Sequence, residues 1–368
     1  MGLHIGGTET HIKELARRFA KRGHEVHIIT SKGDKLKDYE SYMKVWYISR
    51  NWRESPFPRS FRQDALLPLY MIVFCTKALV KFCALWLNGV RFDVASVHWT
   101  PEAILMRLLR PLLRLPYVFV LEGYTDHEAR WARYADLQIA ISRDIVDRCF
   151  MNHGYKPVLI PIGIGAEKYD VDGTHTRKAF CKKNEKLVVT VCRLDPRKDI
   201  PTLVSAARIV CEKDDNVKFI IVGDGPDKQR IERMIQTLNL SDKVKIVRKV
   251  PVTPDFYKAG DLFVLPSLYE GLGIVFLEAM SARLPIIATR VGAIPEILGD
   301  VGILIPPRRP EMLADKILEV IHNDKLRERM IEKGLNRLER YDWERLIVEY
   351  EKAYLSATNF ASKNSKRD

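Results

Sequence analysis

Helix-like and strand-like patterns of apolar and polar residues alternate along the first part of the chain. Over residues 8–22 the apolar side chains recur at helical spacing, which is typical of an amphipathic helix, and Gly23 follows as a C-cap. Strands are predicted over 25–30, 92–97, 117–121, 137–141 and 158–161. Such alternation predicts a parallel sheet covered by helices, so this part of the chain is expected to form an α/β domain.

A second run of the same alternation begins near residue 187. Strands are predicted over 187–191, 217–222, 244–247, 262–265, 285–288 and 302–305, with helices over 200–210 and 228–238. Because 368 residues are too many for one ordinary hydrophobic core, we predict two Rossmann-like domains. They span 1–163 and 185–340, with a polar, irregular linker over 164–184. A last helix is expected over 341–357, followed by a flexible tail over 358–368.

The most apolar stretch covers residues 65–87. It is long enough to cross a bilayer, which takes about 20 apolar residues. Three interpretations follow: a helix packed on the sheet, a helix that partly enters a membrane surface, and a membrane span. The packed helix is favoured, because Lys77 and Lys81 near the centre would be costly in hydrocarbon and the α/β pattern continues downstream.

Composition and charge narrow the class of partner. Apolar residues make up 46% of the chain and charged residues 29%, which is typical of a globular protein and disfavours disorder and a fibrous repeat. The net charge of +13 is shared between the two halves and favours partners with fixed negative charge: nucleic acid, an anionic membrane or a phosphorylated small molecule. The six cysteines form no CxxC pair, which favours reduced thiols in the cytosol.

Two segments have residues suited to binding phosphate. Gly7 lies in a Gly-Gly-Thr sequence before the first helix, where backbone N–H groups hold anions, although an ordinary turn with an N-cap has the same pattern. Arg193 and Lys198 follow the strand predicted over 187–191, and the carboxyl end of a parallel strand faces the ligand in doubly wound folds. A diphosphate is the natural partner of these two cations, and a solvated loop is the alternative.

A third segment combines glycines with carboxylates. Gly271 and Gly273 let the backbone approach a ligand just before a helix that begins at Ile274. Glu270 precedes the first glycine and Glu278 lies within the helix. Carboxylates at this spacing can hold hydroxyl groups of one extended polar ligand, such as a sugar and a ribose. The alternative is a helix-capping acid followed by a solvent-facing acid.

Together the motifs form an ordered set along nearly the whole chain. The set is Gly6-Gly7-Thr8-Glu9, Gly23-His24-Glu25-Val26, Arg193-Leu194-Asp195 with Lys198, Gly223-Asp224-Gly225-Pro226, Asp261, Pro266-Ser267, Glu270 to Glu278, Gly292 to Glu296, and Tyr341-Asp342-Trp343. In this order and spacing it resembles the family 4 retaining glycosyltransferases. The resemblance implies the GT-B fold, in which two Rossmann-like domains face each other across a cleft and the C-terminal helix crosses back to the first domain.

The resemblance also implies roles for individual residues. The second domain would bind a nucleotide diphosphate sugar, and the first domain would bind the acceptor. Arg193 and Lys198 would neutralise the departing diphosphate, Glu270 would hold the donor sugar, and Glu278 the ribose. Further donor contacts are implied for Gly7, Arg248, Val250, Gly271, Leu272, Gly273, Ile274 and Val275. No metal ion and no cofactor is then expected, and the only DxD sequence, at 170–172, is interpreted as a turn.

Two features depart from the family pattern. Glu122 stands where the family usually has a His that contacts the donor sugar, so the donor preference differs or the activity is weak. His98 and His127 lie nearby in the sequence and are candidates to substitute for the missing His. The family also places a hydrophobic strand before the Gly-Gly loop, and only Met1 to Ile5 precede it here. We therefore expect a truncated or differently started form that lacks this first strand.

The sequence thus predicts a metal-independent, retaining glycosyltransferase. It would move a hexose or N-acetylhexosamine to a carbohydrate or lipid-linked acceptor. The alternatives are a nucleotide-sugar epimerase of the same fold and a weakly active or degenerate glycosyltransferase subunit. Nucleic acid is not an expected partner, because only the charge supports it. We expect a cytoplasmic protein, and the basic charge and the 65–87 stretch further predict peripheral contact with an anionic membrane on the cytosolic face.

Overall fold

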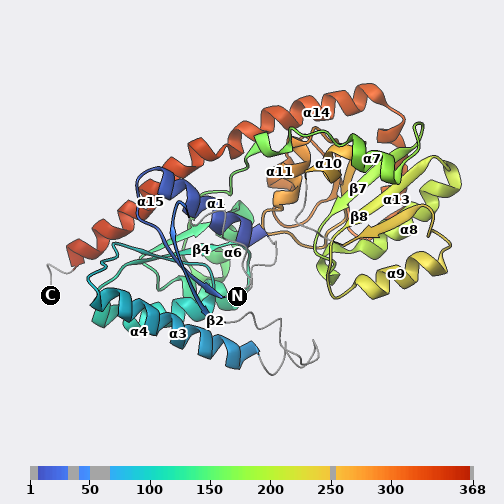
Figure 1. Cartoon of the computed structure of the whole chain (residues 1–368). Coiled ribbons are helices and arrows are strands. Elements are labelled where there is room, and N and C mark those ends of the chain that lie inside the picture. The colour runs from blue at the N-terminus through green and yellow to red at the C-terminus, as the bar shows by residue number, and fades with distance from the viewer. Residues whose placement is uncertain (1–6, 32–40, 50–66, 249–253, 365–368) are drawn as a thin grey trace. The chain divides into compact units, whose positions relative to one another are not determined.

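The chain divides into two compact units. The computed structural model describes residues 7–31, 41–49, 67–248 and 254–364 (Figure 1). The first unit consists of Met1–Ile141, Ile145–Ile160 and Glu344–Asp368, and the second of Ser142–Asp144 and Pro161–Trp343. The segment predicted as a linker, 164–184, therefore belongs to the second unit.

The first unit contains two parallel sheets covered by helices. Its elements are α1 (Gly7–Lys21), β1 (His27–Ser31), β2 (Lys44–Ser49), α3 (Leu67–Leu87), β3 (Ala95–Val97), α4 (Thr100–Leu113), β4 (Tyr117–Leu121), α5 (Asp126–Ala132), β5 (Leu137–Ala140), α6 (Arg143–His153) and β6 (Val158–Leu159). Strands β1 and β2 pair with each other, and the other four lie in the order β3-β4-β5-β6. All five residues of β4 are buried, as expected for an inner strand covered on both faces.

The apolar helix α3 packs within this unit. It contacts β1, β2 and α4, and α3 and α4 run next to each other in Figure 1. The ammonium of Lys81 lies 3.5 Å from the centre of the Trp46 ring on β2, so a cation–π contact accommodates this central lysine. Within the described parts of the chain, no helix is long and apolar enough to cross a membrane. The contacts of α3 with β1, β2 and α4 agree with the interpretation of the 65–87 stretch as a helix packed on the sheet.

The last helix, α15 (Trp343–Asn364), starts at the end of the second unit, but its residues from Glu344 onward cluster with the first. The hydroxyl of Tyr350, which is fully buried, donates a hydrogen bond of 3.1 Å to the carbonyl oxygen of Ile160. This helix therefore completes the core of the first unit.

The second unit is a doubly wound α/β domain. Its main elements are β7 (Lys186–Val191), α8 (Ile200–Lys213), β8 (Val217–Val222), α9 (Lys228–Thr237), β9 (Val244–Val247), α10 (Asp255–Ala259), β10 (Leu262–Leu265), α11 (Ile274–Ser281), β11 (Ile286–Thr289), α12 (Ile294–Leu298), β12 (Ile303–Ile305), α13 (Pro310–Ile321) and α14 (Asp324–Leu338). All six strands are parallel, in the order β12-β11-β10-β7-β8-β9. The strand order reverses between β7 and β10.

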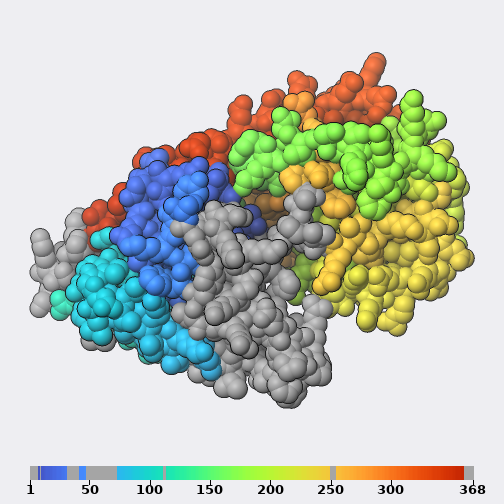
Figure 2. Space-filling model, in the orientation of Figure 1, coloured from blue at the N-terminus to red at the C-terminus, as the bar shows by residue number. Residues whose placement is uncertain are grey.

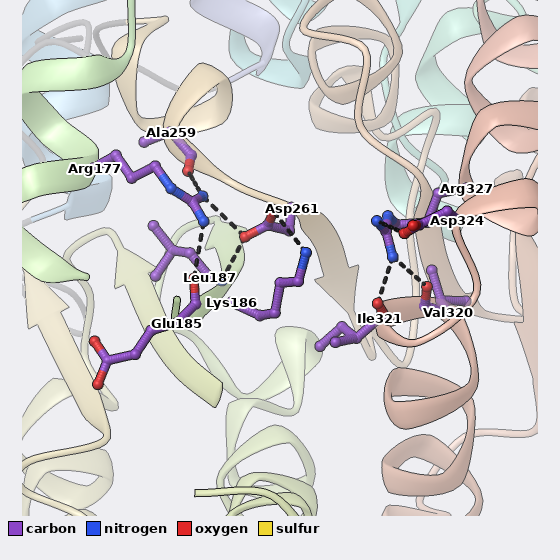
Figure 3. A network of polar contacts seen from close by, with 10 residues as sticks. All are labelled: Arg177, Glu185, Lys186, Leu187, Ala259, Asp261, Val320, Ile321, Asp324 and Arg327. Atoms are coloured by element: carbon purple, nitrogen blue, oxygen red, sulfur yellow. Dashed lines mark hydrogen bonds and ion pairs between the residues drawn. The ribbon is translucent and has the colours of Figure 1, made fainter. Parts of the chain in front are cut away.

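The segment 164–184 is irregular only in part, which corrects the expectation from its polar composition. It contains a short 3₁₀ turn, η4 (Ala166–Tyr169), and the helix α7 (Thr174–Phe180), which contacts α10. Figure 3 shows how Arg177 of α7 holds this segment: its guanidinium donates to the Asp261 carboxylate at 2.9 Å and to the Ala259 carbonyl at 2.7 Å. The Asp172 carboxylate accepts from Thr174 N at 2.9 Å, a local contact that fits the predicted turn.

Candidate active site

Most of the predicted site residues lie near the point in the second sheet where the strand order reverses. Strands β7 and β10 are neighbours, with Phe263 opposite Val189. Because both strands are parallel, the segments that follow them leave the sheet at the same edge. In open α/β sheets this is the place where ligands bind, outside the carboxyl ends of the strands at the switch point. The loop after β7 contains Arg193 and Lys198, and the loop after β10 contains Glu270.

The loop after β7 is shaped by a buried aspartate. Asp195 Oδ1 accepts from the backbone N–H of Arg197 at 3.0 Å and caps a short 3₁₀ turn, η5 (Pro196–Lys198). The Arg197 guanidinium also donates to the Asp195 carboxylate, and this hydrogen bond raises the pKa of Arg197. Arg193 keeps 49% of its side chain exposed, with Nε 3.8 Å from Asp195 Oδ2. Its guanidinium is therefore available to an anion at this edge of the sheet.

Glycines after β8 bring a second loop against the first. The backbone N–H of Leu194 donates to Asp224 O, and that of Asp227 donates to Leu194 O, both at 3.0 Å. A Cβ atom added to Gly223 would lie 2.0 Å from Cys192 O, and one added to Gly225 would lie 2.0 Å from Leu194 O. Only glycine allows two backbones to approach so closely. These contacts fix the loop that contains Arg193.

Lys198 and Glu270 form the central ion pair of the site. Lys198 Nζ lies 2.5 Å from Glu270 Oε1, and the Ser267 hydroxyl donates to the same oxygen at 2.7 Å. The side chains are 17% and 8% exposed. The backbone of Glu270 is held as well, because its carbonyl accepts from Ala293 N at 3.2 Å. Two residues predicted from separate strand ends are therefore brought together in one preorganised pair.

The helix after this pair presents backbone N–H groups and a second carboxylate. Gly273 caps α11 in the left-handed region, at φ 84°, and the first N–H groups of a helix have no partner within it. Leu272 is buried, so its side chain belongs to the core, whereas Gly271, Ile274 and Val275 are partly exposed. Glu278 accepts a hydrogen bond from the hydroxyl of Tyr257. Burial and the Glu278 charge raise the pKa of Tyr257, so this hydroxyl remains a donor.

The other predicted donor residues lie elsewhere. Arg248 follows β9, two strands away from β7, with 80% of its side chain exposed and Nε 3.6 Å from Asp224 Oδ2. Val250 lies outside the described residues. Gly7 begins α1 in the first unit.

Glu122 lies in the first unit directly after β4, in a cluster with two histidines. Its Oε1 accepts from His11 Nδ1 at 2.9 Å and from His98 Nδ1 at 3.0 Å. Burial raises the pKa of this carboxyl, but the two imidazoles outweigh burial and lower it to about 2, so the carboxylate is ionised at neutral pH. His127, the other nearby histidine, is exposed and outside the cluster.

Sequence reasoning missed His11. It lies on the inward face of α1 and is fully buried, and Leu15 and Ala16 on the same helix are also buried. A histidine on the apolar face of an amphipathic helix was the signal that could have found it. What the pattern could not supply is its partner, because His11 and Glu122 are 111 positions apart.

The comparisons with known proteins cover both units. Residues 5–168 match the family described as Glycosyltransferase Family 4, and residues 173–337 match Glycosyl transferases group 1. The chain therefore belongs to the family 4 glycosyltransferases and has the GT-B fold. The predicted fold class, with its parallel α/β sheets, is confirmed.

Three similar proteins illustrate the match. The chain is 26% identical to N-acetyl-alpha-D-glucosaminyl L-malate synthase of Bacillus anthracis, over 95% of this chain and 94% of that one. It is also 26% identical to the phosphatidylinositol N-acetylglucosaminyltransferase GPI3 subunit of Saccharomyces cerevisiae, over 80% and 67% of the two chains. The crystal structure of Anabaena HepE in complex with UDP and glucose superposes with a TM-score of 0.80 at 20% identity, over 97% of each chain.

Proposed function

We propose that this glycosyltransferase moves a hexose or N-acetylhexosamine, with retention, from a nucleotide diphosphate sugar to a carbohydrate or lipid-linked acceptor. The observation that carries the proposal is the Lys198–Glu270 pair at the switch point, with the exposed guanidinium of Arg193 on the same loop. The two cations suit a diphosphate, and the carboxylate suits the hydroxyl groups of a sugar.

In this proposal the protein acts mainly on the leaving group. Arg193 and Lys198 stabilise the negative charge that develops on the diphosphate as the bond between the anomeric carbon and the phosphate oxygen breaks. A metal ion has this role in other transferases. The departing phosphate takes the proton of the acceptor hydroxyl. Glu270 orients the donor sugar, and Glu278 holds the ribose. Residues near Arg248 bind the base, and no cofactor or metal ion takes part in the transfer.

The names of the relatives favour one donor for the first test. The Bacillus anthracis and yeast relatives both have N-acetylglucosaminyl in their names, and HepE was crystallised with UDP. We therefore place UDP-N-acetylglucosamine first among the donors. The word phosphatidylinositol in the name of the yeast relative supports the lipid-linked class of acceptor.

The binding step is tested by thermal denaturation with UDP-, GDP- and ADP-sugars. At about 100 times its dissociation constant a donor adds about 2.7 kcal/mol of stability, which raises the melting temperature by about 5 °C or more. Arg193→Ala is expected to remove most of this shift, because the diphosphate loses a cation. Arg208→Ala is the matched control, since Arg208 pairs with Glu212 on the surface of α8 in the same unit. A wild-type protein that no nucleotide sugar stabilises contradicts the proposal.

Turnover of the bound donor separates the proposed function from its alternatives. Incubation with donor and acceptor is expected to give a glycoside with the anomeric configuration of the donor, at the same rate with and without added magnesium or manganese. Free epimerised nucleotide sugar in the absence of acceptor would identify an epimerase. Donor binding without any product would identify a degenerate subunit.

Contact with an anionic membrane is proposed for the surface of α3 and α4. Val80, Leu87 and Leu108 are 64%, 77% and 73% exposed, and side chains of these helices lie on the surface of the first unit (cyan in Figure 2). Lys77 on α3 and Arg107 on α4 are also exposed. Exposed apolar and basic side chains together favour an anionic lipid surface. The free cysteines fit a cytoplasmic setting for this contact.

Cosedimentation with lipid vesicles tests this contact. The protein is expected to bind vesicles that contain phosphatidylserine at low salt, and to bind pure phosphatidylcholine vesicles much less. Leu87→Asp is expected to weaken binding several-fold, whereas Leu335→Asp, at an exposed leucine of α14, leaves it unchanged. A protein that stays in the supernatant with anionic vesicles at low salt contradicts the membrane proposal.

A further inference from the structure

Three side chains with metal-binding atoms converge in the first unit, and the proposed transfer reaction does not use them together. His11 comes from α1, His98 follows β3, and Glu122 follows β4. One nitrogen or oxygen atom from each lies within 4.8 Å of the other two. Two imidazoles and one carboxylate, from segments far apart in the sequence, make a donor set that zinc accepts in proteins.

The spacing of these atoms is close to that of a coordination site. Nδ1 of His11 and Nδ1 of His98 lie 2.9 and 3.0 Å from Glu122 Oε1. Around a tetrahedral zinc ion with bonds of about 2.0–2.1 Å, neighbouring ligand atoms are about 3.3 Å apart. Each of these two distances therefore differs from the zinc-site value by only a few tenths of an ångström, and the third pair of ligand atoms lies within 4.8 Å.

Contacts behind the ligands hold His98 in place. His98 Nε2 lies 2.9 Å from Ser96 Oγ, and Ser96 Oγ lies 2.5 Å from the hydroxyl of Tyr354. A metal-binding histidine usually has its second nitrogen fixed by a hydrogen bond of this kind, which sets the ring orientation. The backbone N–H of His98 donates to Glu102 Oε2 at 3.1 Å and positions the loop.

Burial separates this cluster from ordinary surface histidines. The side chain of His11 is fully buried, and those of His98 and Glu122 are each 7% exposed. The small exposed fraction of His98 and Glu122 means that the cluster is not sealed from solvent. The surface pair of His24 with Glu351 Oε1, at 2.6 Å, has its histidine 42% exposed and is no part of the cluster.

We propose that His11, His98 and Glu122 bind one zinc-class divalent ion in the first unit, with a fourth position left for water or another ligand. The ion would join α1 to the carboxyl ends of β3 and β4. This proposal is independent of the reaction proposed above. Magnesium and manganese favour oxygen ligands. A transfer rate that does not change when these ions are added is therefore compatible with zinc bound at two nitrogens.

Metal analysis of the full chain tests the site. Protein loaded with zinc and passed through a desalting column is expected to retain one equivalent and to melt at a higher temperature than protein treated with chelator. Cobalt bound in its place is expected to show the visible absorption of a tetrahedral ion without the near-ultraviolet band of a cobalt–thiolate bond. That band would assign the ion to cysteines and overturn the proposal.

The variants separate metal binding from hydrogen bonding alone. Glu122→Gln and His98→Ala are each expected to lose the retained equivalent, and Ser96→Ala to weaken zinc binding about tenfold through His98. His24→Ala is the control and keeps one equivalent. Wild-type protein that retains no zinc, or Glu122→Gln that retains as much as wild type, shows a hydrogen-bonded cluster only. If the ligand variants fail to fold, wild-type stoichiometry and Ser96→Ala decide the question.

Discussion

Replacing Glu270 with alanine will lower kcat/KM for sugar transfer by about 100-fold or more while the protein stays folded. Glu270 Oε1 is held by Lys198 and Ser267, so the carboxylate is fixed before a donor arrives. Loss of one preorganised polar group at a reacting centre typically costs about 10²–10³ in rate. The same substitution is expected to lower the free energy of unfolding by about 1–3 kcal/mol, because Lys198 is left without its partner. Initial rates with the donor found by thermal denaturation, together with melting curves, measure both effects.

Two further variants make the interpretation specific. Glu270→Gln keeps an oxygen for the Ser267 hydroxyl but removes the charge, so it is expected to retain more stability than Glu270→Ala. Glu319→Ala removes a carboxylate that pairs with Lys316 on the surface of α13 in the same unit, and it should leave kcat/KM unchanged. Wild-type turnover in folded Glu270→Ala protein would remove this residue from the proposed site.

Substituting alanine for Gly225 is expected to destabilise the second unit by about 3 kcal/mol or more. The added Cβ would lie 2.0 Å from the carbonyl oxygen of Leu194 and 2.7 Å from its nitrogen, and both are backbone atoms that cannot rotate away. One of the two loops must move by about 1 Å or more, and close-packed interiors resist such shifts. The loop that moves is either the one that contains Arg193 or the one that packs against it, so donor binding should weaken as well.

Chemical denaturation measures this effect against a matched glycine. Gly334 lies inside α14, where the nearest atoms to an added Cβ would be side-chain atoms of Met280 and Val301 at 3.4 Å, an ordinary contact distance. Gly334→Ala is therefore expected to be neutral or to stabilise by up to about 1 kcal/mol, through its higher helix propensity. A Gly225→Ala protein within about 0.5 kcal/mol of wild type would show that the two loops adapt easily.

The sequence was sufficient for several of the short strands in both units. Strands β4, β8, β9 and β10 have the predicted bounds, because each is a short, mainly apolar run between polar turns. Strand β2 was missed although its Val45-Trp46-Tyr47-Ile48 run consists of residue types that favour a strand. Helix α7 was also missed, because its position depends on Arg177 binding Asp261, which lies 84 positions away.

The candidate site was also predictable in part. The proximity of Lys198 and Glu270 could be predicted, because each follows a strand and parallel strands end at one edge of the sheet. Tyr257 as the partner of Glu278, and His11 as the partner of Glu122, depend on how helices pack against the sheets. No local spacing contains that information, so the segments of the candidate site could be predicted and their buried partners could not.

The path of the chain through α15 sets the order in which the protein is finished on the ribosome. Strands β3 to β6 leave the ribosome early, but Tyr350, which closes the core over Ile160, follows the entire second unit. Domains usually fold as units, with the N-terminal one first. Here the first unit is the first to be synthesised and the last to be completed, so the newly made chain carries an open first core while the second unit is being translated.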